Sequence, residues 1–323
     1  MKLGLIFLVA ATATAACSNG GAERACVVGA DCASGVCRGD GTCGPAGGDA
    51  GSAGADGGAA DGTVAPDGAS SSGDGASSGD GAPPDDGPVT GCVPNQDGTI
   101  VRGEIPLGPG LHAKYRVAQN AGVSTAGTAQ ADGSRVWDLT GALSGDHDLL
   151  VETLAPAGQW FAADFASATY TARLSDSADL LGVFQTTPGA ILLLGEVSPA
   201  SGATSTKLSN SAGVPTLSFP MKMGTTWNAN VNVTGTADGV AVVYTEAYET
   251  SIDAYGTMKT PFAEFHVLRV NTKLTRTVGV VPTVIRTFAF VAECAGPVAT
   301  IVSQNNETVT EFTSASEVQR LAP

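Results

Sequence analysis

A short run of acids around a histidine contains the side chains best suited to chemistry. Asp146, His147 and Asp148 are consecutive, and side chains of these types bind metal ions or transfer protons. Adjacent residues on a β-strand point to opposite faces, so the three could share one metal ion only within a loop. A solvated turn is the favoured interpretation, and a weak metal or acid–base site is the alternative. We therefore predict no catalytic residue, no metal ligand and no cofactor.

The common motifs of nucleophilic, metal and phosphate chemistry do not occur in the sequence. It has no G-x-S-x-G, no H-E-x-x-H and no phosphate-binding glycine loop. Asp164, Asp176 and Glu196 are carboxylates with apolar neighbours, but the paired acids of glycoside hydrolysis must be brought together in space. Four aromatic residues could line a sugar-binding face or pack in a core: Trp160, Phe161, Phe165 and Tyr170. The sequence thus predicts no enzyme.

The first sixteen residues, MKLGLIFLVAATATAA, have the pattern of a secretory signal peptide. One positive charge at Lys2 precedes an apolar stretch, residues 3–11, and small residues follow it. We predict a signal peptide over residues 1–16 and export of the rest of the chain. The apolar stretch is shorter than the roughly 18 to 20 residues that span a bilayer, and no later stretch reaches that length. No transmembrane helix is expected.

The chain has seven cysteines, and an odd number in an exported protein leaves one thiol without a disulfide partner. Cys17 follows the signal peptide directly and is the natural candidate for the odd one. The remaining six form an even set that can oxidise completely outside the cytoplasm. They are Cys26, Cys32, Cys37, Cys43, Cys92 and Cys294.

The small residues Thr14, Ala15 and Ala16 before Cys17 resemble the lipobox of bacterial lipoproteins. The resemblance implies that Cys17 becomes the first residue of the mature chain and carries the lipid, with residues 17–25 as a tether. The family usually has an aliphatic residue at the position of Thr14, so ordinary cleavage and free secretion is the alternative. Ser18, where an Asp would suggest retention in the inner membrane, favours the outer membrane.

Residues 26–43 place four cysteines within eighteen residues. So short a segment cannot bury a useful core, so disulfides must supply its order. Three pairings are open, and we expect Cys26 with Cys37 and Cys32 with Cys43. A zinc site is the alternative, although the C-x2-C spacing is absent. The DCASGVC core resembles a small cysteine-rich motif of exported proteins of myxobacteria and their relatives, a resemblance that implies no known activity.

Residues 44–91 consist almost wholly of Gly, Ala, Ser, Asp and Pro. Eight Asp and no Lys or Arg lie here, so about half of the formal net charge of −15 belongs to this stretch. Such a composition cannot bury enough apolar surface to offset the entropy of ordering. We predict a disordered acidic linker.

Residues 92–323 contain repeated runs of alternating polar and apolar residues separated by turn residues. In TWNANVNVT, residues 226–234, apolar Trp227, Ala229, Val231 and Val233 alternate with polar residues, as in a strand with one buried face. Similar runs are HAKYRVA, SRVWDLT, DLLVETL, ATYTARL, AILLLGEV, VAVVYTEAYET, FHVLRVNTKLTRTV, TVIRTFAFVAE and VATIVSQ. We predict an all-β domain, mainly an antiparallel sheet, in a sandwich, a half-barrel or a curled open sheet. Only residues 156–165 and 314–321 could be helical.

Cys92 and Cys294 are the cysteines of this domain. A disulfide between them would close a long loop and stabilise the fold by about 4 to 5 kcal/mol in the entropic description. It would join the end of the linker to the last part of the sheet.

Three stretches of the domain resemble uncharacterised exported β-proteins, including those of the DUF3108 type. They are FPMKMGTTW, DAYGTMKTPFAEFHVLRV and FVAECAGPVATIVS, within the last hundred or so residues. Ala263 stands where the T-P-x-G-x-F step of these proteins has Gly. The resemblance implies a β fold, and some such proteins have a curled sheet over a hydrophobic cavity, as in lipoprotein carriers.

These features predict an exported protein held by lipid in the outer membrane, on its periplasmic or surface face. The leading hypothesis is a non-catalytic β domain with a binding or structural role in the cell envelope. A periplasmic carrier of lipid or another hydrophobic ligand is the second, and it requires an apolar cavity. A hydrolase of envelope polymer ranks last, because it requires two carboxylates or a histidine–acid pair in a cleft. Expected partners are the membrane and an envelope protein, glycan or lipid; the acidic charge argues against nucleic acid.

Overall fold

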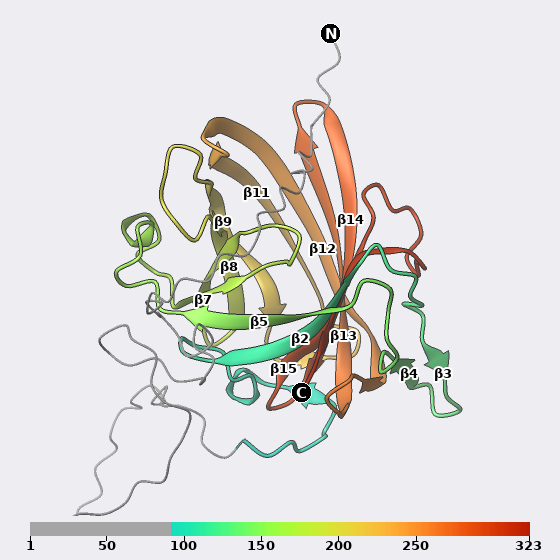
Figure 1. Cartoon of the computed structure of the whole chain (residues 1–323). Helices are drawn as coiled ribbons and strands as arrows, with labels where there is room; N and C mark the ends of the chain where they lie inside the picture. The colour runs from blue at the N-terminus through green and yellow to red at the C-terminus, as the bar shows by residue number, and fades with distance from the viewer. Residues whose placement is uncertain (1–91) are drawn as a thin grey trace, which may run out of the picture. The chain divides into compact units, whose positions relative to one another are not determined.

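The computed structural model of the chain describes residues 92–323 (Figure 1). The predicted signal peptide, tether, cysteine-rich segment and linker lie outside the described residues, as do Cys17, Cys26, Cys32, Cys37 and Cys43. Within residues 92–323, no helix is long and apolar enough to cross a membrane.

The described residues form strands and two short 3-10 helices, which confirms the predicted all-β class. The first eight strands are β1 (Thr99–Ile100), β2 (His112–Gln119), β3 (Thr128–Ala129), β4 (Arg135–Asp138), β5 (His147–Leu154), β6 (Tyr170–Arg173), β7 (Leu181–Thr186) and β8 (Ala190–Val197). The others are β9 (Lys207–Ser218), β10 (Met221–Lys222), β11 (Thr226–Ala237), β12 (Val240–Lys259), β13 (Glu264–Val278), β14 (Val281–Ala292), β15 (Gly296–Ser303) and β16 (Ala315–Leu321). The 3-10 helices are η2 (Arg102–Glu104) and η3 (Ala162–Asp164).

Twelve antiparallel strands close into a barrel. Their order is β11-β9-β8-β7-β6-β5-β2-β16-β15-β14-β13-β12, and β12 pairs with β11 again. Strand β4 adds in parallel to the end of β12, and β3 pairs with β4. The sheet is therefore fully closed, where the sequence suggested a sandwich, a half-barrel or a curled open sheet. Closure leaves no unpaired strand edge along β9, β11 and β12. An exposed edge of such long strands could pair with another chain and cause aggregation.

One half of the barrel interior is filled by apolar side chains that converge from strands all around the wall. Side chains alternate between the two faces of a strand, so the inward positions are fixed by the register. This inner cluster consists of Ile100, Ile105, Tyr170, Ile191, Leu217, Met221, Ile252, Leu268, Val270 and Val291. Ile105, directly after η2, is fully buried. The segment before β2 therefore plugs this end of the barrel.

Two further clusters pack on the outside of the wall. The larger one covers β12 to β16 and β2, where Trp137 of β4 contacts Phe290 edge to face. Beneath it, Arg269 is buried and donates to Asp253, to Glu311 and to the carbonyl of Thr125. These hydrogen bonds hold the loops around residues 125 and 311 against the wall, because a buried guanidinium without partners would be strongly destabilising.

The two stretches that could have been helical have different outcomes. Residues 156–165 contain only the single 3-10 turn η3. The prediction that residues 314–321 could be helical is wrong. Residues 315–321 form β16, which pairs with β15 on one side and β2 on the other. Glu, Gln, Arg and Leu favour helices locally, but two flanking strands supply backbone hydrogen bonds that override this weak preference.

Cys92 and Cys294 form a disulfide, the pairing expected from the sequence, with their Cα atoms 5.6 Å apart. Cys294 lies in the turn between β14 and β15, and its N–H donates to the carbonyl of Glu104 at 2.7 Å. The start of the domain is thus fixed at the plugged end of the barrel.

Replacing both cysteines, Cys92→Ala with Cys294→Ala, is expected to lower the free energy of unfolding by about 4–5 kcal/mol. The closed loop spans 202 residues, so its release restores much freedom to the unfolded chain. Urea unfolding followed by circular dichroism measures the change. The double variant leaves no free thiol at either site, and an unchanged urea midpoint would show that the disulfide contributes nothing to stability.

Candidate functional site

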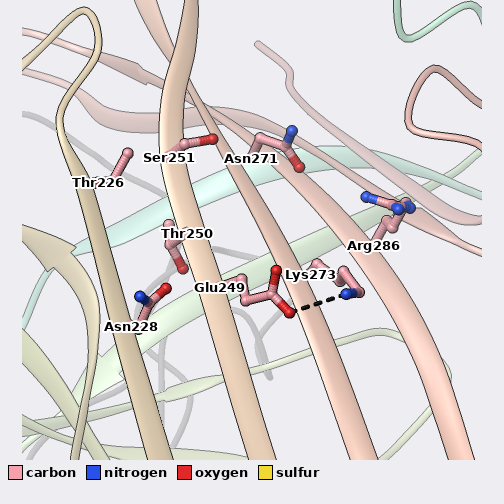
Figure 2. A pocket seen from close by; sticks show the side chains of 8 residues that line it. All are labelled: Thr226, Asn228, Glu249, Thr250, Ser251, Asn271, Lys273 and Arg286. Atoms are coloured by element: carbon pink, nitrogen blue, oxygen red, sulfur yellow. Dashed lines mark hydrogen bonds and ion pairs between the residues drawn. The ribbon is translucent and has the colours of Figure 1, made fainter.

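A polar depression of about 390 Å³ lies on the outer face of the long strands β11 to β14 (Figure 2). It is lined by Thr226, Asn228, Glu249, Thr250, Ser251, Asn271, Lys273 and Arg286. No aliphatic or aromatic side chain is among these eight. The lining offers hydroxyl and amide groups, one carboxylate and two cations, which can hydrogen-bond a polar ligand.

The register of the strands brings these side chains together. Asn228 pairs with Glu249 across β11 and β12, and Glu249 pairs with Lys273 across β12 and β13. The ammonium of Lys273 donates to Glu249 Oε1 at 2.9 Å. Thr250 points to the other face, where its hydroxyl lies 3.2 Å from that of Thr272. Equivalent positions on four strands therefore produce one continuous polar surface.

A second depression, of about 230 Å³, continues this face toward the free ends of the hairpins. Its outward side chains are Asn230, Asn232, Thr245, Ala247, Thr275 and Thr277. We call the outer face of β11 to β14 around the two depressions the polar wall. The wall carries several hydroxyl and amide groups, which can hydrogen-bond a polar ligand.

An ionic cluster lies on the inner face of the same strands. Arg276 Nε donates to Glu246 Oε1 at 2.7 Å, and the Tyr248 hydroxyl donates to Glu246 Oε2 at 2.5 Å. The Arg276 guanidinium lies 5.1 Å from the centre of the Tyr244 ring. Glu196 approaches from β8; burial raises the pKa of this carboxyl, the charge of Arg276 opposes the rise and that of Glu246 adds to it.

This inner cluster contains two carboxylates in different environments, which is a requirement for an acid and base pair. Glu196 lines neither depression, however, and both oxygens of Glu246 already accept hydrogen bonds. Burial also raises the pKa of Tyr248, and the charge of Glu246 adds to the effect. The contacts of Glu246 therefore neutralise its charge inside the barrel, and Glu196 faces neither depression.

The structure separates the three consecutive residues Asp146, His147 and Asp148. Asp146 Oδ2 accepts from Arg320 at 2.6 Å, and both side chains are buried. His147 Nε2 lies 3.0 Å from Asp176, and Asp148 accepts from Arg116 at 2.8 Å. Among residues 92–323, no group of three or more His, Cys, Asp or Glu side chains could hold a metal ion.

His147 and Asp176 do form a histidine–acid pair, but the pair is tied to the rim of the barrel. The carbonyl of Gly145 contacts Nδ1 and raises the pKa of His147; burial opposes this, and Asp176 raises the pKa further. Asp176 also accepts from Gln119, and its backbone N–H donates to Glu317. Neither residue lines the polar wall.

The remaining residues singled out by the sequence have structural surroundings. Phe161 and Phe165 are buried against the outer face of β7 and β8, while Tyr170 stacks on Phe184 inside the barrel. Trp160 donates to the carbonyl of Ser198, and Asp164 pairs with Lys207. The four aromatics therefore do not form a sugar-binding face, since packing uses them at two different places.

The inner and outer ion pairs of β13 offer a matched comparison. Arg276→Met should lower the free energy of unfolding by about 1–3 kcal/mol, because it leaves the buried carboxylate of Glu246 without its cation. Lys273→Met breaks an exposed pair on the same strand and should cost less than about 1 kcal/mol. Urea unfolding of both variants tests the assignment. Equal losses would contradict the view that the inner cluster compensates buried charge.

The polar wall was not predicted from the sequence, because its residues come from four strands whose register the sequence does not specify. The only signal was the alternation of Asn and apolar residues in TWNANVNVT, which marks an exposed polar face without its neighbours. A scan against protein-family models gave no match, and neither did searches of curated proteins and of solved structures.

Proposed function

We propose that the protein is a cell-envelope lipoprotein, anchored in the outer membrane through lipid on Cys17. Its barrel is a non-catalytic module that binds an envelope glycan on the polar wall. The observation that carries this proposal is the 390 Å³ depression, lined by eight residues without an aliphatic or aromatic side chain among them.

The chemistry of the wall favours a sugar polymer over other ligands. Glycan hydroxyls both donate and accept hydrogen bonds, and so do the amides and hydroxyls of Asn228, Ser251 and Thr226. The paired strands hold these groups in place, so little side-chain freedom is lost on binding. Glu249 pairs with Lys273, and Arg286 adds one further cation, so the lining has a small positive charge and suits a neutral or weakly acidic ligand.

The carrier hypothesis receives less support. A carrier of apolar molecules needs unfilled apolar space. Ile105, Met221 and Ile252 are fully buried in the half of the barrel closed by the disulfide, and they occupy that space. The other half is packed by a second apolar cluster, which includes Leu193, Val231 and Val233. It also contains the charged side chains of Glu196, Glu246 and Arg276, which suit an apolar ligand poorly.

The lipoprotein part of the proposal rests on the sequence of residues 1–43. A signal peptide that ends in small residues before Cys17 fits lipidation, and it accounts for the odd cysteine. Free secretion is the alternative. On either route the chain reaches an oxidising compartment, in which Cys92 and Cys294 can form their disulfide.

Lipidation is tested by growing a bacterial host that expresses the full chain with radiolabelled palmitate. The wild-type protein is expected to carry the label, and Cys17→Ala is expected to lose it. Cys26→Ala, a change at a neighbouring cysteine, should keep the label and serves as the control. Label that persists in Cys17→Ala, or none in the wild type, contradicts anchoring at Cys17.

Glycan binding is tested by co-sedimentation with purified peptidoglycan sacculi and by affinity electrophoresis in soluble outer-membrane polysaccharide. The double variant Asn228→Leu with Ser251→Val should weaken binding about tenfold, because each lost hydrogen bond is worth about 0.5–1.5 kcal/mol. Thr234→Leu changes an exposed residue of the same strand outside both depressions and should bind like the wild type. No binding by the wild type to either polymer, or equal binding by all three proteins, refutes the proposal.

A further inference from the structure

Five exposed valines gather at one end of the barrel. They are Val240 and Val243 at the start of β12, Val278 at the end of β13, and Val280 and Val281 in and after the turn that follows. Their exposed fractions range from 54% to 93%, the highest at Val280. Figure 1 shows the β11–β12 and β13–β14 turns at the same end of the molecule.

The register places the two turns that carry these valines at the same end of the barrel. Thr245 of β12 pairs with Thr277 of β13, and Val278 pairs with Val281 across the next turn. Two adjacent hairpins therefore project their turns side by side. None of the five belongs to a core cluster of the described residues, so the fold does not use them for packing.

The two turns carry very little charge. Residues 277–285 and residues 239–245 contain no Asp, Glu, Lys or Arg, and Asp238 is the one acid in the β11–β12 turn. Exposed surfaces of soluble domains usually carry charges of both signs and no large apolar patch. An apolar surface without them marks a contact site.

We propose that these two turns insert into a lipid surface, with Val240, Val243, Val278, Val280 and Val281 as the inserted side chains. This surface is called the valine tip. It lies outside the polar wall and does not depend on glycan binding or on the lipid at Cys17.

The size of the valine tip argues for lipid over a second copy of the chain. Five valines expose an area on the order of 500 Å². A stable dimer buries about 800 Å² on each partner, with complementary shape across the contact. Hydrocarbon needs no complementary shape, and the paired strands satisfy the backbone of the inserted residues up to the turns.

The position of the valine tip fits an envelope protein that is anchored elsewhere. Strand β14 begins at Val281 and ends at Ala292, two residues before Cys294. The disulfide that fixes the start of the domain is therefore at the opposite end of this strand from the valine tip. Insertion would give the protein a membrane contact separate from the point where residues 1–91 join the barrel.

Vesicle flotation tests the proposal on residues 17–323 carrying Cys17→Ala, exported behind a cleavable leader so that no lipid is attached. Neutral phosphatidylcholine vesicles are the probe, because the chain has a formal net charge of −15 and anionic lipid would repel it. The protein is expected to float with the vesicles. Val280→Asp combined with Val243→Asp should reduce the bound fraction at least tenfold.

Val93→Asp is the matched control, since Val93 is also an exposed valine but lies beside the disulfide. It should float like its parent. Circular dichroism establishes that the variants fold. In addition, Val280→Trp should give fluorescence that brominated phosphatidylcholine quenches, which reports insertion directly.

Three results would overturn the proposal. The parent protein could remain in solution as a monomer, or the Asp variant could float as well as its parent. Light scattering could instead show a dimer that the same Asp substitutions abolish, which would assign the valine tip to a second copy of the chain. Glycan binding by the Asp variant should stay unchanged, so a failure of this proposal is distinguishable from a failure of the glycan site.

Discussion

Strand β11 pairs with β9 along one side and with β12 along the other, and the remaining features of the barrel depend on that double pairing. Val233, for example, lies opposite both Asn210 and Tyr244. Because side chains alternate along each strand, a slip of one residue would exchange the inner and outer faces of the sheet. Closure thus fixes at once which residues fill the interior and which form the polar wall.

The closed wall also accounts for its buried charges. A sheet with a covered outer face has few places where a charged side chain can reach water, and an unpaired buried charge is strongly destabilising. Arg269 and Arg320 under the outer loops, and Glu246 on the inner face, each contact an oppositely charged residue. Each of these pairs joins a loop to a strand, or one strand to its neighbour. The loop–strand pairs hold the outer loops against the barrel.

Local patterns in the sequence identified much of the fold but not its closure. AILLLGEV corresponds residue for residue to β8, and the run from Val240 marks the start of β12. Strand β16 was missed because its residues favour a helix locally, and its strand state depends on neighbours distant in the sequence. The polar wall was missed for a related reason: Asn228, Glu249 and Lys273 become neighbours only through a register that no local pattern encodes. The Cys92–Cys294 disulfide could be predicted from the sequence, because counting cysteines requires no knowledge of the strand register.

The same four strands carry three surfaces of different character, and strand geometry makes this arrangement feasible. Alternation separates the polar outer wall from the ionic cluster inside, although Glu249 and Tyr248 are adjacent in sequence. The polar wall and the valine tip lie at different positions along the strands, since the turns project beyond the last polar pair, Thr245 with Thr277. A turn residue such as Val280 lies outside the paired strands. Its side chain is therefore not constrained by cross-strand neighbours, as the residues of the polar wall are. Surface chemistry can therefore vary along and across these hairpins without disturbing the closure that holds them.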